Sequence, residues 1–176
     1  MLATLALGCL VRSGIAHDDL DGATFRSDDW KVSIEAPKGW KVSLDASYPS
    51  ILLWMVHRSP DARMLFSAEP LPTIKDSQSY AVESAKKLEA LGYRVRTPQL
   101  HSATGAYWVD FDDGEHFLRQ AVLVIEETRL GYALTLSAPD LRTRGQFLRA
   151  FDFSLRHIVP KRSKSKAAGQ PTTPNE

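Results

Sequence analysis

Cysteine is nearly absent from this chain, and that scarcity excludes several kinds of protein. Of the 176 residues only Cys9 carries a thiol. One cysteine can form neither an intrachain disulfide framework nor a metal site built from several thiolates. Histidine does not compensate, because no pair has the i, i+4 spacing of a zinc-peptidase helix. The histidines are His17, His57, His101, His116 and His157.

The sequence also lacks the glycine-rich and nucleophile motifs of several enzyme classes. Neither Gly-x-Gly-x-x-Gly nor Gly-x-x-x-x-Gly-Lys occurs, so no loop of these kinds is present to bind a phosphate. No Gly-x-Ser-x-Gly turn occurs either, although Ser102, His116 and Asp110 supply on paper the residue types of a serine triad. We therefore predict a protein that is not an enzyme and that has no cofactor.

Charge of one sign does not predominate. The chain has 22 Lys and Arg against 21 Asp and Glu, a balance that exerts no overall attraction on nucleic acid or on an anionic membrane. The two flanks differ from each other: residues 10–29 are small and acidic, whereas residues 160–176 are basic and contain no aromatic side chain. We expect a flexible acidic tether over 10–29, a disordered basic tail over 160–176, and no nucleic-acid partner.

Long apolar runs are missing as well, since none approaches the roughly 20 residues that span a bilayer. The N-terminus nevertheless has a short apolar stretch, Leu5-Ala6-Leu7-Gly8, directly before Cys9. That order is typical of a bacterial lipoprotein signal, in which a small residue precedes a cysteine that receives a lipid. Only eight residues precede Cys9 and none is basic, so residues 1–9 are interpreted as a truncated signal whose true start lies upstream. A non-lipid signal and a chance apolar N-terminus are the alternatives.

Between the flanks, residues 30–159 have the patterns of one α/β domain. Apolar and polar residues alternate through Trp30–Ala36 and again through Trp40–Leu44, which predicts strands whose two tryptophans face the core. The unbroken apolar run Ile51–Val56 predicts a strand covered on both faces. The order that follows is a returning strand, a helix, four strands and a last helix.

The boundaries of these later elements come from turn and cap residues. They are a strand at Arg63–Glu69, a helix from Asp76 or Ser77 to Leu91, a strand at Tyr93–Arg96, a hairpin of 106–111 and 117–126 around Asp112-Asp113-Gly114, a strand at Gly131–Ala138, and a helix after Pro139-Asp140 with Leu141, Phe147, Leu148 and Phe151 on one face. Because hairpin turns predominate, we expect a mostly antiparallel sheet with the two helices packed against it.

This order and its opening residues resemble a known superfamily. The segment Trp30–Trp40, with its Pro-x-Gly-Trp link, is similar to the start of the PsbP-like α/β/α sandwich proteins, and the segment Phe147–Leu155 matches the end of that plan. The group includes DcrB-type bacterial lipoproteins, the PsbP proteins of photosynthetic membranes and a small Ran-GTPase-binding protein. The resemblance, over Phe25–Val159, implies binding, assembly or chaperone roles at a cell envelope.

Two kinds of candidate site remain. The segment from Asp110 to His116 gathers Asp110, Asp112, Asp113 and His116, whose oxygen and imidazole ligands make it a weak cation candidate. A helix-loop-helix calcium site does not fit, because Ala121 occupies the position of its last ligand, and Asp113-Gly114 is by itself a hairpin signal. The weak partner-binding candidates are the aromatic residues Trp54, Tyr107 and Trp108, the last two pointing to opposite faces of a strand.

These observations favour a non-catalytic module, exported and anchored through a lipid on Cys9, that binds or stabilises another envelope protein at the periplasmic face of a bacterial membrane. One alternative is a cytoplasmic chaperone, similar to those that shelter the apolar helices of type VI secretion effectors. The other alternative is a small hydrolase or cation-binding protein that uses the Asp110–His116 region.

Overall fold

The computed structural model describes residues 18–44, 50–71, 73 and 76–160. Within these residues the chain forms two helices, α1 (Ser77–Ala90) and α2 (Leu141–Arg156). The strands, in chain order, are β1 (Asp18–Asp21), β2 (Thr24–Ser27), β3 (Val32–Glu35), β4 (Lys41–Ser43), β5 (Ile51–Arg58), β6 (Asp61–Pro70), β7 (Arg94–Val95), β8 (Gln99–His101), β9 (Ala106–Asp112), β10 (Phe117–Ile125), β11 (Leu130–Ala138) and β12 (Val159–Pro160).

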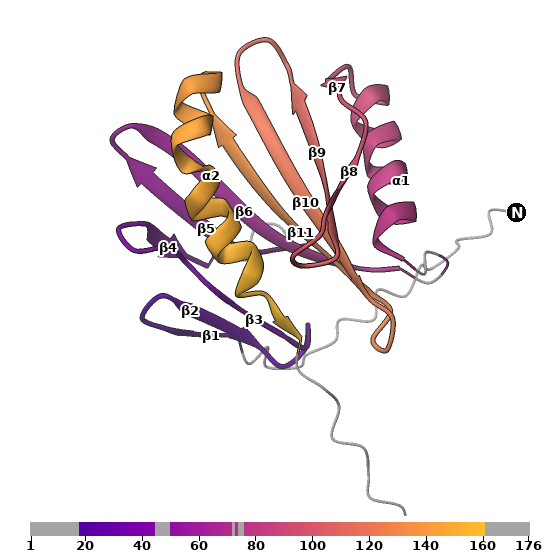
Figure 1. Cartoon of the computed structure of the whole chain (residues 1–176). Helices are drawn as coiled ribbons and strands as arrows, with labels where there is room; N and C mark the ends of the chain where they lie inside the picture. Colours follow the sequence, from indigo (N-terminus) through magenta and orange to yellow (C-terminus); the bar gives the residue numbers. More distant parts are fainter. Residues whose placement is uncertain (1–17, 45–49, 72, 74–75, 161–176) are drawn as a thin grey trace, which may run out of the picture.

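The strands form a large sheet and a small one, and all of their pairings are antiparallel within the described residues. The large sheet has the order β4-β5-β6-β11-β10-β9-β7, with β8 also paired to β9, and the small sheet has the order β1-β2-β3-β12. The predicted strands at Trp30–Ala36 and Trp40–Leu44 therefore belong to different sheets, where a single sheet was expected. Figure 1 shows the small sheet beside the large one.

The two helices lie on opposite faces of the large sheet. Successive strand residues point to opposite faces, and on β11 the side chain of Ala133 packs with Tyr80 and Ala81 of α1. Its neighbours Tyr132 and Leu134 instead belong to the cluster that contains residues of α2. The predicted α/β arrangement, a mostly antiparallel sheet with helices against it, is confirmed (Figure 1).

Two buried hydrogen bonds tie the layers together: one joins the small-sheet segment to the large sheet, and the other joins α2 to the small sheet. The hydroxyl of Tyr132 donates to the carbonyl oxygen of Trp30 at 2.7 Å, and the hydroxyl of Ser154 on α2 donates to the carbonyl oxygen of Glu35 at 2.8 Å. Tyr132 and Ser154 are fully buried. A buried hydroxyl without a partner destabilises the fold, so these bonds favour one relative placement of the layers.

The helix boundaries follow the predicted capping chemistry. Asp76 accepts a hydrogen bond from the backbone N–H of Ser79 at 2.7 Å, and Asp140 accepts one from Thr143 at 2.8 Å. Each side chain satisfies a backbone donor that the first helical turn leaves unpaired. Both expected N-caps are confirmed. The expected apolar face of the second helix is less accurate, because Leu141 is 49% exposed.

The domain begins earlier than predicted. The acidic tether expected over 10–29 is wrong for its second half, because β1 and β2 form a hairpin there and Phe25 is fully buried. Leu20 and Phe25 are directly opposite each other in this hairpin. Two apolar residues among many aspartates are too few to show a strand pattern in the sequence, and Phe25 is buried only because the core lies beside it. Residues 1–17 and 161–176, which include the predicted signal and nearly all of the predicted basic tail, lie outside the described residues.

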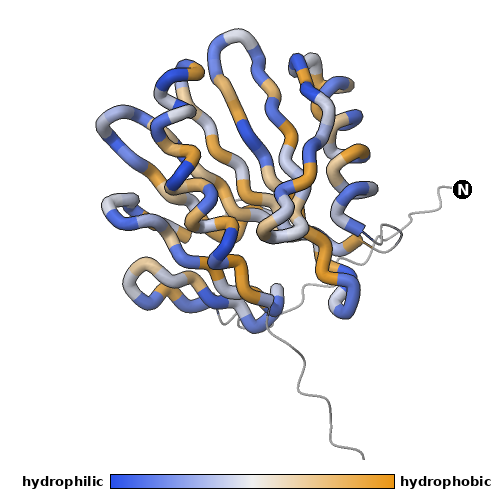
Figure 2. Tube along the Cα trace, viewed as in Figure 1, coloured by the Kyte–Doolittle hydropathy of each residue, from blue (hydrophilic) through white to orange (hydrophobic). Residues whose placement is uncertain are grey.

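The apolar run Ile51–Val56 is covered on only one face by described residues, where coverage on both was predicted. Leu52, Leu53 and Met55 are buried in the core beneath α2, whereas Trp54 and Val56 are partly exposed. A register shift between Ile51 and Leu53 places two consecutive leucines in the core. Figure 2 shows apolar and polar residues interleaved along the strands of the large sheet. A continuous apolar run is therefore no proof that both faces of a strand are covered.

Close packing around Gly131 yields a test of this arrangement. A methyl group added at Gly131 would collide with the Leu71 side chain and lie 2.7 Å from Cε1 of Tyr80. We expect Gly131→Ala to lower the free energy of unfolding by about 1–3 kcal/mol, because overpacking displaces both side chains. The midpoint of urea unfolding measures this effect. The matched control is Gly145→Ala on the exposed side of α2, where nothing lies within 4 Å; it should raise stability by up to about 1 kcal/mol. Equal effects of the two substitutions would contradict the packing described here.

Candidate functional site

Charged side chains form a row across one edge of the large sheet. Asp110 on β9 lies directly opposite Arg119 on β10, and the backbone N–H of Arg96 donates to the carbonyl oxygen of Asp110 at 2.8 Å. Cross-strand neighbours point to the same face, so the row Arg96–Asp110–Arg119 lies on the face that carries α2. Arg144 approaches this row from the first turns of α2. We call Arg96, Arg119 and Arg144 the arginine cluster.

Asp110 is the anion at the centre of this cluster. Arg119 donates from Nε and Nη2 to the two carboxylate oxygens, both at 2.7 Å, and Arg144 Nη1 lies 3.0 Å from Oδ1. Arg144 also donates to the carbonyl oxygen of Leu118 at 3.1 Å. The side chains of Asp110, Arg119 and Arg144 are only 17%, 14% and 13% exposed. Such a two-pronged pair, mostly removed from water, is held in one geometry.

The charges of the cluster shift the pKa values of its members. Burial alone would raise the pKa of Asp110, but the hydrogen bonds and charge of Arg119, together with the charges of the other two arginines, lower it below its ordinary value of 3.8. Burial lowers the pKa of Arg144, and the charge of Asp110 opposes that shift. The carboxylate is therefore ionised at neutral pH and stabilises the guanidinium groups around it.

An aromatic and imidazole contact extends the cluster along the sheet. The guanidinium carbon of Arg119 lies 4.3 Å from the ring centroid of Trp108, and the His101 ring lies 5.1 Å from the same ring. Trp108 Nε1 donates to Gln99 Oε1 at 3.3 Å. The predicted partner-binding residue Trp108 is thus partly enclosed by polar neighbours. Tyr107 points to the opposite face, as predicted, and packs in the core beneath α1.

His101 has contacts that resemble part of a catalytic triad. Its Nδ1 lies 2.7 Å from Thr104 Oγ1, and its Nε2 lies 3.0 Å from Asp152 Oδ1. The Thr104 oxygen also accepts the backbone N–H of Ala106 at 3.3 Å, within the turn that joins β8 to β9. Asp152 Oδ1 has no well-directed hydrogen bond. These contacts stabilise the turn and link it to α2.

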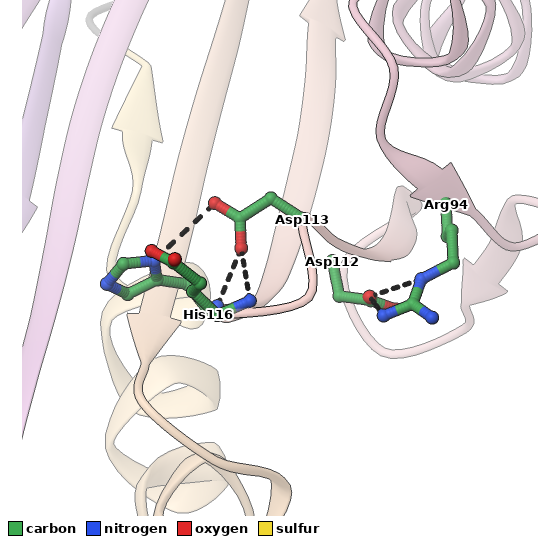
Figure 3. A network of polar contacts seen from close by, with 5 residues as sticks. Arg94, Asp112, Asp113 and His116 are labelled. Carbon is green, nitrogen blue, oxygen red and sulfur yellow. Dashed lines mark hydrogen bonds and ion pairs between the residues drawn. The ribbon is translucent and has the colours of Figure 1, made fainter.

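The four residues that were only weak candidates for a cation site have separate partners. Asp110 faces Arg119, and Asp112 pairs with Arg94 on β7. Asp113 accepts the backbone N–H groups of Glu115 and His116 at 2.9 and 2.6 Å, and its other oxygen lies 3.5 Å from His116 Nδ1 (Figure 3). These backbone hydrogen bonds are the main reason why the pKa of Asp113 is lowered.

The described residues of this segment are thus arranged neither as a cation site nor as a serine triad. Among residues 18–44, 50–71, 73 and 76–160, no group of three or more His, Cys, Asp and Glu side chains could hold a metal ion. The carboxylate of Asp110 is engaged by Arg119 and Arg144, so it does not orient His116 in a triad with Ser102. The turn chemistry of Asp113 explains the density of acidic residues.

A partly exposed apolar surface lies on the opposite face of the large sheet. Trp54 on β5 is directly opposite Leu65 on β6, and the neighbouring Val56 points the same way. Among the described elements, α1 packs against β7, β9 and β10, so no described helix covers this half of the sheet. The next residues along the rows are short and polar, Ser43 beside Trp54 and Thr135 beside Leu65. We call Trp54, Val56 and Leu65 the apolar face.

Trp54, a candidate partner-binding residue in the sequence, therefore lies in the apolar face beside Val56 and Leu65. Its indole Nε1 is buried and has no hydrogen-bond partner within the described residues.

The arginine cluster was not predicted from the sequence. The sequence feature that could have revealed this cluster is the hairpin at Asp112-Asp113-Gly114, because the register of that hairpin pairs Asp110 with Arg119.

Comparisons with known proteins identify the fold and leave the family open. No family model matches the chain, and no curated protein matches it. Among solved structures, the chain is similar to the Ran-binding protein Mog1p of Saccharomyces cerevisiae, with a TM-score of 0.56 and 7% identity over 74% of this chain and 90% of that one. At this identity the likeness concerns the fold alone. It agrees with the observed α/β architecture, and the finer DcrB-type resemblance stays a prediction. In the part of the chain described, no helix has the length and apolar character needed to span a membrane.

Removing the central carboxylate tests the role of Asp110. In Asp110→Asn the guanidinium groups of Arg119 and Arg144 lose their counter-charge while mostly buried, so we expect a loss of about 2–4 kcal/mol of stability at neutral pH. Asp112→Asn is the control, because its partner Arg94 is 72% exposed, and it should cost less than about 1 kcal/mol. Urea unfolding of both variants measures the difference.

The same variants predict a pH dependence. The pKa of Asp110 is lower in the folded chain than its ordinary value of 3.8, so its contribution to stability is present above that value and is lost as the pH falls through the folded pKa. We expect the stability difference between the unsubstituted chain and Asp110→Asn to shrink below about pH 4. A difference that stays constant into that acid range would contradict the ion-pair assignment.

Proposed function

We propose that this chain is a non-catalytic module that binds a partner protein through the apolar face. The observation that carries the proposal is the position of Trp54, partly exposed beside Leu65 on a half-sheet that no described helix covers. Tryptophan is enriched among the few residues that contribute most of the binding energy at protein interfaces.

The composition of the surrounding surface also supports protein binding. Short hydroxyl side chains, Ser43, Ser67 and Thr135, flank the apolar residues, and the charged residues Asp61 and Arg63 lie near the start of β6. An apolar centre with a polar rim is typical of a protein interface. Mog1p, whose fold is similar, is named a Ran-binding protein, so this fold serves protein binding in at least one other case.

A photo-crosslinking experiment tests the proposal in cells. We expect p-benzoylphenylalanine at position 54 to yield a discrete adduct with another protein after irradiation of the native host, because the aromatic replacement keeps the bulk of Trp54 at the interface. Mass spectrometry then identifies the adduct. The control is the same amino acid at Lys86, an exposed position of α1. Absence of an adduct at position 54, or the same adducts at both positions, would refute binding at the apolar face.

The finer proposal is that the module is exported and anchored by a lipid on Cys9, at the periplasmic face of a bacterial envelope membrane, and that its partner is another envelope protein. Support comes from Leu5-Ala6-Leu7-Gly8-Cys9, where a small residue and a thiol follow an apolar stretch. A cytoplasmic chaperone for apolar helices is the second candidate, because the apolar face suits that role equally well.

Mass spectrometry of the mature protein from its native host separates these two candidates. Export with lipidation predicts a new N-terminus at Cys9 that carries a diacylglyceryl or triacyl group, and Cys9→Ser should abolish the modification. A chain that retains an unmodified Met1 and Cys9 would contradict the lipoprotein proposal and favour the cytoplasmic chaperone.

A further inference from the structure

We propose that the arginine cluster is a second binding site, which takes a carboxylate-rich segment of a partner protein. The site is separate from the apolar face, because Asp110 and Arg119 lie on the face of the large sheet that carries α2, whereas Trp54 lies on the other face. The inference therefore goes beyond the proposed function and does not depend on it.

The arginine cluster contains more cations than anions. In the row across the sheet edge, Arg119 uses two nitrogens on the two oxygens of Asp110, and Arg144 approaches the same carboxylate. Arg94, in the adjacent row, donates a hydrogen bond to Asp112 and forms an ion pair with it. The side chain of Arg96 has no hydrogen bond or ion pair to any described residue. One carboxylate thus faces three arginines, two of which are mostly buried.

The cluster also contains a hydrogen-bond donor that no described residue satisfies. Arg144 Nε is buried and has no hydrogen-bond partner among the described residues. A buried donor of a charged group without an acceptor costs free energy. A carboxylate that enters between Arg96 and Arg144 would balance the excess charge and could accept from that donor. The cluster therefore gains more from an anion than an exposed arginine does.

The chemistry of the cluster favours carboxylates of a protein over nucleic acid. Arginine forks match the geometry of a carboxylate with two parallel hydrogen bonds. Nucleobases need a free aromatic face on which to stack, but Trp108 is already in contact with Arg119 and His101.

A peptide-binding measurement on the full chain tests this site. The probe is a fluorescein-labelled oligoglutamate peptide, and fluorescence anisotropy reports its affinity at low and at physiological salt. We expect saturable binding that weakens as salt screens the charges. Arg96→Gln should weaken binding about tenfold, because a charge-assisted pair is lost, and Arg96→Glu should abolish it. Arg96 is exposed, so both variants should fold, and circular dichroism verifies that they do.

Two control variants locate the binding. Arg63→Gln removes a cation from the opposite face of the sheet, where the Arg63 side chain is 60% exposed, and Lys164→Gln removes one from the basic C-terminal segment. Neither should change the affinity more than about twofold. Equal weakening by Arg96→Gln and either control would overturn the proposal, since the attraction would then be general or would belong to the C-terminal segment.

Further outcomes concern the occupant. Tighter binding of an RNA oligonucleotide of equal charge, lost in Arg96→Gln, would overturn the protein-segment assignment in favour of nucleic acid. Self-association at low salt that Arg96→Gln removes, measured by sedimentation, would show that a second copy occupies the site. A negative peptide result together with a positive crosslink at position 54 would refute this inference alone and leave the proposed function standing.

Discussion

The central strand β11 is the element on which the rest of the structure depends. It pairs with β6 on one side and β10 on the other, and both of its faces are buried along much of its length. One face carries large side chains, Tyr132, Leu134 and Leu136, and the other carries small ones, Gly131 and Ala133. The large side chains fill the space beneath α2 and the small sheet, whereas the small ones let Tyr80 of α1 and Leu71 approach the backbone closely.

This asymmetry explains the two surfaces of the molecule. Because α1 packs over β7, β9 and β10, it leaves the part of the same face around Trp54 without a described helix. On the opposite face α2 packs over β6 and β11, and its first turns carry Arg144 to β9 and β10, which hold Asp110 and Arg119. An apolar surface and a basic one therefore lie on opposite faces of one sheet. A module with two dissimilar faces is well suited to holding two segments of partner protein at once.

Much of the fold is visible in the sequence, and the reason is that caps and turns act locally. Asp76 and Asp140 begin their helices as expected, and the hairpin around Asp113-Gly114 is present. The errors arise where burial depends on distant residues. Phe25 lies in a segment that reads as a tether, yet it is fully buried because α2 and the strands form a core beside it. Trp54 lies in an apolar run, yet it is partly exposed because α1 packs elsewhere on that face.

The candidate sites, like the fold, depend partly on local sequence and partly on tertiary packing. The sequence by itself determined the main strands and both helices between residues 30 and 156, the alternation that sends Tyr107 and Trp108 to opposite faces, and the turn whose register sets Asp110 opposite Arg119. Only the tertiary structure decided that Arg144 reaches Asp110 from a helix that begins some thirty residues later, and that Arg96 lies beside Asp110 with no side-chain hydrogen bond to a described residue. The physical reason is that the interactions involved act over different distances along the sequence. Backbone hydrogen bonds of turns and caps act within a few residues, whereas burial and charge pairing depend on side chains that only the complete packing brings together.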